Sequence, residues 1–240
     1  MTYIIVAAGM GTRLRPYTLN CPKGLFHLDR NTTLIGHLID GIRKADPEAE
    51  IVLCTGFCTE KMEEALKDRN VIFRFNPFYE VTNSLSTLWF ARGYLDREQV
   101  VIIDGDIIAE QKLISEVYAV PVDHPVSLMD SSKADTGDYC VKTDEKGRVI
   151  AMAKGLREPS GEYCNVSKLD RKTALRFRDK MDEMLRKGYI NEWMETCLNQ
   201  LVFEEGMELY TKDIAGYAWA EVDDASEMAA VRTIYAEEKK

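Results

Sequence analysis

Short apolar runs alternate with amphipathic stretches over about the first hundred residues of the chain. The apolar runs are rich in β-branched residues and too brief for helices, so each one predicts a buried strand. These strands are expected at residues 4–6, 51–53, 71–75 and 100–103. Helical spacing of apolar residues predicts helices at residues 34–43, 59–68 and 82–95. Such alternation is typical of a parallel sheet with helices on both faces, which binds ligands beyond the carboxyl ends of its strands.

The pattern changes near residue 126. Further strands are expected at residues 126–129, 138–143, 148–153, 162–167 and 217–222. Helices are expected at residues 171–187 and 191–201. Asp224 and Glu227 have the spacing of a capping box that opens a final helix, which runs to about Glu238. We therefore expect a single domain over residues 1–240, with residues 1–125 and 217–240 as its core and residues 126–216 as a lobe that forms the far wall of a cleft.

Bulk properties narrow the classes of function. The formal net charge of -9 argues against sequence-independent nucleic-acid binding, which needs a basic face. The six cysteines form no Cys-x-x-Cys pair and the three histidines are scattered, so zinc spacing is absent. The chain opens with an expected core strand rather than a signal peptide, and its apolar stretches are too short to span a bilayer. We expect a cytoplasmic protein without membrane insertion.

The segment after the first strand has the residues of a phosphate-binding loop. Ala8, Gly9 and Gly11 let the backbone approach a ligand closely, and their N–H groups suit phosphate oxygens. Arg13 and Lys23 add positive charge. The Gly-Lys-Ser/Thr ending of a P-loop is absent, and Leu14 stands where a dinucleotide fingerprint needs glycine or alanine. The alternative is a glycine-rich turn without a ligand.

Two groups of carboxylates follow expected strands. Asp104 and Asp106 flank Gly105, while Glu221 and Asp223 precede the capping box. Because Mg²⁺ binds one or two carboxylates together with substrate phosphates, the pattern predicts a magnesium site at Asp106 and Asp223, with Glu221 as a further candidate ligand. Asp104 could equally be a turn former. For Asp223 the alternative is a helix-start acid, but Asp224 already fills that role, which favours metal binding.

The glycine-rich loop with Pro22-Lys23, the Asp104-Gly105-Asp106 element and the late Glu221-Val222-Asp223 together resemble the nucleotidyltransferases of the nucleotide-sugar pyrophosphorylase superfamily. Segments 76–79, 83–89 and 192–195 look most like the bacterial phosphocholine cytidylyltransferases. Cytidylyltransferases for 2-aminoethylphosphonate are close relatives of these enzymes. The resemblance implies a three-layer αβα sandwich of the nucleotide-diphospho-sugar transferase (Rossmann-like) fold, with a mixed, mostly parallel sheet and an inserted substrate lobe.

The resemblance also implies roles for individual residues. Arg13, Lys23 and Asp106 would be catalytic. The nucleotide would contact Ala7, Ala8, Gly9, Gly11, Thr12, Arg13, Lys23, Gly56, Asn83 and Ser86. Lys154 would hold the acceptor phosphate. Independently of the resemblance, a quaternary ammonium group cannot donate hydrogen bonds and is usually held by aromatic faces with a carboxylate nearby, so Tyr163, Trp193 and Glu195 are the expected acceptor contacts. Asn83 could instead only cap its helix, Lys154 could be a solvated turn residue, and the aromatic residues could belong to the core.

The expected reaction is Mg²⁺-dependent transfer of CMP from CTP to phosphocholine, which gives CDP-choline and pyrophosphate. Alternative acceptors are 2-aminoethylphosphonate, another small phosphate or phosphonate, and a sugar 1-phosphate. Other classes of function are a non-catalytic nucleotide-binding module and a nicotinamide-dependent oxidoreductase, the latter disfavoured by Leu14. A monomer or homodimer without a nucleic-acid partner is expected.

Overall fold

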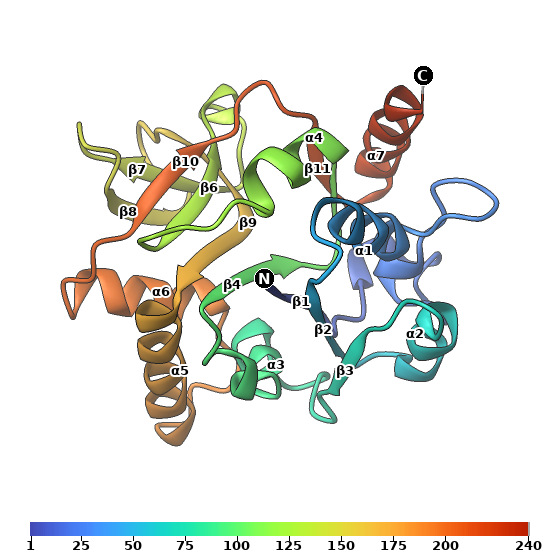
Figure 1. Ribbon diagram of the computed structural model, residues 1–240, viewed down its shortest axis with the longest axis horizontal. Coiled ribbons are helices and arrows are strands. Elements are labelled where there is room, and N and C mark those ends of the chain that lie inside the picture. Colours follow the sequence, from blue (N-terminus) through green and yellow to red (C-terminus); the bar gives the residue numbers. More distant parts are fainter. Residues whose placement is uncertain (240) are drawn as a thin grey trace.

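One continuous sheet forms the centre of the molecule (Figure 1). The computed structural model describes residues 1–239, and for residues 225 and 226 only the backbone. The strands of the sheet are ordered β10-β6-β9-β4-β1-β2-β3, with the β7–β8 hairpin attached to β9. Their bounds are β1 Thr2–Ala7, β2 Glu50–Thr55, β3 Ile72–Phe75, β4 Gln99–Asp104, β6 Val126–Asp130, β7 Tyr139–Thr143, β8 Val149–Lys154, β9 Gly161–Asp170 and β10 Tyr210–Asp213.

The helices lie on both faces of this sheet. They are α1 Leu34–Ala45, α2 Thr59–Leu66, α3 Ser84–Trp89, α4 Gln111–Leu113, α5 Arg171–Arg186, α6 Met194–Phe203 and α7 Ala225–Glu238, and a π-helical turn at Ile114–Tyr118 follows α4. Strands β1 to β4 pair in parallel, while β9 runs antiparallel to both β4 and β6. The α/β class and the mixed, mostly parallel sheet are therefore confirmed.

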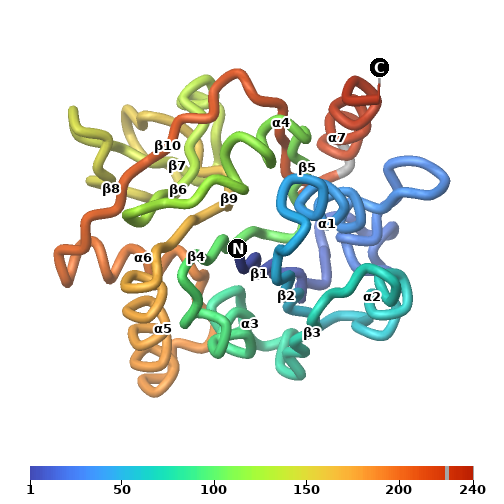
Figure 2. The backbone as a smooth tube through the Cα atoms, viewed as in Figure 1, coloured from blue at the N-terminus to red at the C-terminus, as the bar shows by residue number. Residues whose placement is uncertain are grey.

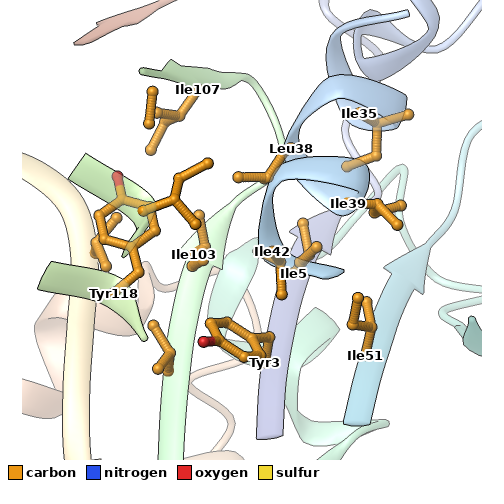
Figure 3. Close-up of a cluster of buried hydrophobic side chains, with 14 of the residues drawn as sticks. Tyr3, Ile5, Ile35, Leu38, Ile39, Ile42, Ile51, Ile103, Ile107 and Tyr118 are labelled. Atoms are coloured by element: carbon orange, nitrogen blue, oxygen red, sulfur yellow. The ribbon is translucent and has the colours of Figure 1, made fainter. Parts of the chain in front are cut away.

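The side chains of β1 point alternately to the two faces of the sheet, which explains why helices cover both faces. Tyr3 and Ile5 are fully buried on the face that α1 covers, where they join a cluster with Leu38 and Ile42 (Figure 3). Ile4, between them, belongs to the cluster on the opposite face, which includes side chains of α3, α5 and α6. Successive side chains of a strand point to opposite faces, so a central strand that is apolar throughout needs a helix layer on each side.

The structure differs from the sequence prediction at several elements. The helix expected at residues 82–95 spans only Ser84–Trp89, and a separate 3-10 helix follows at Arg92–Tyr94. Strand β10 was not predicted, because its Tyr-Thr-Lys-Asp sequence has no apolar run. Strands β6, β9 and β10 continue the sheet of β1 to β4.

A second small sheet joins the late strand to the middle of the chain. β11 (Trp219–Glu221) pairs antiparallel with β5 (Ile107–Ala109), a strand that the sequence did not indicate. Helix α7 then returns to the N-terminal part of the chain and lies near α1 (Figure 2). There the hydroxyl of Tyr235 donates to Asp29 at 2.6 Å. Among the described residues, no helix has the length and apolar character needed to cross a membrane.

Candidate active site

A cleft with a volume of about 460 Å³ opens at the carboxyl ends of β1 and β4. The loop after β1, the Asp104-Gly105-Asp106 turn and the end of β11 line one part of it. Residues of β7, β8, β9 and the start of α6 line the other part. The cleft therefore joins the phosphate loop to the expected acceptor wall.

The backbone after β1 has the form of an anion-binding loop. Gly11 has a φ of 58°, in the left-handed region that favours glycine, and its carbonyl accepts a hydrogen bond from Thr18 Oγ1 at 2.6 Å. An added Cβ at Gly9 would meet no atom within 4 Å, so the loop faces open space there. Within the described chain, the amides of Gly9, Met10 and Gly11 donate to no protein acceptor. They are free to bind phosphate oxygens.

Gly105 allows the end of β4 to contact the end of β1. A Cβ built on Gly105 would lie 2.6 Å from the Cβ of Ala7, closer than side chains approach one another. The Gly105 amide donates to the carbonyl of Val6 at 2.8 Å. Asp104 and Asp106 are thereby held beside the phosphate loop.

Three carboxylates converge at the edge of this loop. Each of Asp106, Glu221 and Asp223 offers an oxygen that lies within 4.8 Å of the others. The β5–β11 pairing brings them together, because its register places Glu221 opposite Ile107, the residue after Asp106. The meeting of these acids therefore depends on a small sheet apart from the main one.

Two cations bind the same carboxylates. Lys23 Nζ lies 2.5 Å from Asp106 Oδ2 and 2.8 Å from Asp223 Oδ1, and Arg13 Nη2 lies 2.7 Å from Asp223 Oδ2. Burial lowers the pKa of Lys23, but the two adjacent carboxylates outweigh it and raise that pKa above its ordinary value. Burial raises the pKa of Asp223, but Lys23 and Arg13 outweigh it and the net shift is downward.

The carboxylates of this site have features that a bound cation would stabilise. Burial, followed by the charges of Asp106 and Asp223, raises the pKa of Glu221 to about 8. One oxygen each of Asp104 and Asp106 is buried without a hydrogen-bond partner. A hard divalent cation prefers such oxygen ligands, so Asp106, Glu221 and Asp223 fit Mg²⁺.

Aromatic side chains form the opposite end of the cleft. The ring of Tyr139 lies 6.2 Å from that of Tyr163 and 6.3 Å from that of Trp193, in edge-to-face arrangements. Trp193 is 43% exposed, whereas Tyr163 is buried and its hydroxyl lies 2.9 Å from Ser167 Oγ. Trp193 therefore offers the more accessible ring face.

Charged groups surround these rings. Lys154, the last residue of β8, places Nζ 2.5 Å from Asp138 Oδ2 and 5.2 Å from the centre of the Trp193 ring. Glu195, in the first turn of α6, is 7% exposed, and burial raises its pKa to about 7. This end of the cleft thus already holds an ammonium group between a carboxylate and an aromatic ring.

Two of the expected nucleotide contacts lie outside the cleft lining of the described residues. Gly56 packs against Ala8 and Tyr79, where an added Cβ would lie within 3 Å of both. Ser86 is buried and donates to the carbonyl of Ile190 at 2.6 Å. Asn83 lines the cleft and also caps α3, since its Oδ1 accepts from the Ser84 amide at 2.8 Å.

Several lining residues were missing from the sequence-based site. Tyr79, Thr82 and Thr87 line the nucleotide side, and Tyr79 and Thr87 lie in segments that the family resemblance had singled out. Asp138 and Asn165 line the acceptor side. Their sequence neighbours do not mark either residue, because Asp138 is placed by the β7–β9 pairing that begins two residues later and Asn165 by the irregular pairing of β9 with β6.

Comparisons with known proteins agree with this geometry. A profile of the nucleotidyl transferase family matches residues 2–163. The chain is 25% identical over 235 residues to a 2-aminoethylphosphonate cytidylyltransferase of Lancefieldella rimae, covering 95% of this chain and 90% of that protein. It is 33% identical over 107 residues to the bifunctional protein GlmU of Francisella tularensis, covering 45% of this chain and 22% of that protein.

Solved structures share the fold. The CTP:phosphocholine cytidylyltransferase LicC of Streptococcus pneumoniae superposes with a TM-score of 0.81 at 20% identity, covering 98% of each chain. The inositol-1-phosphate CTP transferase of T. maritima gives a TM-score of 0.79 at 18% identity, covering 100% of this chain and 96% of that one. With the family profile matching more than half of the sequence, the chain belongs to the nucleotidyl transferase family and is a nucleotidyltransferase enzyme.

Proposed function

We propose that this enzyme transfers CMP from CTP to phosphocholine, with release of pyrophosphate. The observation that carries the proposal is that one cleft is lined by three features. These are the loop at Gly9–Gly11 with its free backbone amides, the carboxylates of Asp106, Glu221 and Asp223, and the exposed ring of Trp193 near further carboxylates. A quaternary ammonium cannot donate hydrogen bonds, so aromatic faces and nearby negative charge are what can hold it. Trp193, Tyr139 and Glu195 supply both.

The nucleotide occupies the loop end of the cleft. The amides of Gly9 to Gly11 bind phosphate oxygens, while Arg13 and Lys23 neutralise the charge that develops on the triphosphate. An oxygen of the acceptor phosphate bonds to the α-phosphorus, and the bond from that phosphorus to the oxygen bridging to the β-phosphate breaks. Pyrophosphate leaves with that bridging oxygen.

The reaction needs no general base. A phosphate monoester has a second pKa of about 6, so the acceptor is largely dianionic at neutral pH. Catalysis then consists of aligning two polyanions and offsetting their charge. Asp106, Glu221 and Asp223 would hold Mg²⁺, which supplies charge neutralisation and orientation of the phosphates when bound.

Lys154 lies where it can serve the acceptor. Its ammonium group is paired with Asp138 and lies 5.2 Å from the centre of the Trp193 ring, and all three residues line the cleft. We propose that Lys154 turns to the acceptor phosphate when the substrate ammonium takes its place over the indole.

The second candidate acceptor is 2-aminoethylphosphonate. Asp138, Glu162 and Glu195 all line this end of the cleft and can accept hydrogen bonds from a primary ammonium. The relative from L. rimae named for this substrate also aligns over nearly the whole chain.

The test is pyrophosphate release by the purified enzyme with CTP or UTP and each of three acceptors: phosphocholine, 2-aminoethylphosphonate and a hexose 1-phosphate. We expect turnover with CTP and phosphocholine, and W193L should raise the KM for phosphocholine about tenfold, as the loss of a cation–π contact predicts. F203A is the control, because Phe203 is an exposed aromatic residue at the end of the helix that Trp193 precedes and is not among the cleft-lining residues. Turnover only with 2-aminoethylphosphonate would select the second candidate, and turnover only with the hexose 1-phosphate would refute both.

A further inference from the structure

Strand β9 loses its regular pairing where it passes the carboxylate cluster. Its pairing with β4 ends at Val166. On its other side, the segment from Tyr163 to Ser167 spans only Ser127 to Met129 of β6, so β9 bulges between them. Asn165 lies in this bulge with a φ of 56°, in the left-handed region.

The bulge directs the Asn165 side chain toward the other sheet. Its Nδ2 donates a hydrogen bond of 2.9 Å to Oε2 of Glu221 on β11, and both residues line the cleft. Glu221 is one of the three carboxylates whose oxygens lie within 4.8 Å of one another. The bond therefore connects the strand that carries Tyr163 directly to the acidic cluster.

The residue type suits this position. Asparagine tolerates left-handed backbone better than other residues with a side chain, whereas a β-branched residue would be strained there. Its amide also donates without adding charge, so it can fix the rotation of a carboxylate while leaving the second oxygen available to a cation. Groups that orient metal ligands in this way commonly change metal affinity 10–100-fold when removed.

We propose that Asn165 is a positioning residue that orients Glu221 for divalent-cation binding. The inference rests on the proposed function, in which Asp106, Glu221 and Asp223 hold the metal. The further point is that the bulged backbone of β9, by placing Asn165 against Glu221, influences how tightly these carboxylates bind the metal.

The test measures binding of Mn²⁺ alone to the full-length protein by calorimetry and electron paramagnetic resonance. N165G removes the side-chain amide that bonds to Glu221. Because glycine adopts the left-handed backbone without strain, any effect on binding reports the lost hydrogen bond and not backbone strain. We expect N165G to weaken Mn²⁺ binding about tenfold. The matched control is N70G, because Asn70 is exposed and also left-handed, with a φ of 50°, and does not line the cleft.

A double-mutant cycle distinguishes positioning from a general structural effect. If Asn165 acts through Glu221, N165G combined with E221A should bind Mn²⁺ no more weakly than E221A alone. Equal Mn²⁺ affinity in N165G and wild type, or full additivity in the cycle, would overturn the inference. Failure of the wild type to bind Mn²⁺ would overturn the metal site of the proposed function and this inference with it. If N165G does not fold, N165S, whose side chain is too short to replace the amide, is measured in the same way.

Discussion

Lys23 is the residue on which the candidate site most depends, because its ammonium group bridges two carboxylates from distant parts of the chain. It contributes positive charge where the triphosphate is expected to lie. A fixed cation of this kind, in a partly dehydrated cleft, stabilises developing charge far more than it would in water.

K23A should reduce kcat about 100–1,000-fold, the range found when a single electrostatic donor is removed from an active site. Pyrophosphate release measures the effect, and circular dichroism should show an unchanged fold. K61A is the control, since Lys61 is exposed and its ammonium group donates to the main-chain oxygen of Asn20, away from the cleft lining. Near-normal turnover in K23A would contradict the proposed role.

Glu195 predicts a pH dependence of acceptor binding. Burial raises its pKa to about 7, so the group is charged at pH 8 and largely neutral at pH 6. The KM for an acceptor with an ammonium group should therefore rise as the pH falls from 8 to 6. The acceptor phosphate also titrates, with a pKa of about 6, so the informative quantity is the ratio of KM in E195Q to KM in wild type.

The ratio of KM in E195Q to KM in wild type should be about 10 at pH 8. It should approach 1 at pH 6, because at that pH both enzymes present a neutral group to the same substrate. Steady-state kinetics at four or five pH values are sufficient. A ratio that stays constant over the range would mean that the charge of Glu195 does not contribute to acceptor binding.

At the scale of elements, the site depends on close contact between the ends of β1 and β4. Gly105 has no room for a methyl group against Ala7. The capping box before α7 forms as predicted, since the Glu227 amide donates to Asp224 Oδ1 at 3.1 Å and the Asp224 amide donates to Glu227 Oε2 at 3.0 Å. It fixes the chain just after Asp223, and so supports the end of β11.

G105A should destabilise the fold by about 1–3 kcal/mol, as overpacking does, and should lower turnover because the Asp104–Asp106 turn is displaced from the phosphate loop. Urea unfolding measures the first effect and pyrophosphate release the second. G93A provides the comparison, since an added Cβ there meets no atom within 4 Å. Equal stability of the two variants would show that the β1–β4 contact adapts to the methyl group.

At the scale of the whole molecule, one ligand should bridge parts of the chain that are far apart in sequence. CTP with Mg²⁺ would contact the loop after β1 and, at the same time, Asp106 just before β5 and the acids Glu221 and Asp223 at the end of β11. A ligand that binds only the folded state stabilises it by about 2.7 kcal/mol at 100 times its dissociation constant.

For a chain of this size, that corresponds to a rise in Tm of about 5–10 °C. Differential scanning fluorimetry should show this rise with CTP and Mg²⁺ together. The shift should largely disappear with EDTA and in D223N, and persist in D179N, whose substituted residue lies on the exposed surface of α5. An undiminished shift in D223N would contradict the bridging arrangement.

The sequence alone determined the features that depend on residues close together in the chain. The β-branched runs and helical periods predicted most strands and helices of the sheet, because buried strands and amphipathic helices each impose a local period on the chain. The glycines after β1 and the aspartates after β4 also indicated their site, since strand ends of a parallel sheet meet at one edge.

The tertiary structure alone decided what depends on long-range pairing. Asp106, just before β5, meets Glu221 and Asp223 at the end of β11 through a small antiparallel sheet whose strands are too short to have a recognisable period. Asn165 reaches Glu221 because of a bulge, and Lys154 reaches Asp138 because β7 and β8 pair. Which residues become neighbours across such pairings is set by packing of the whole chain, which no local pattern of residues records.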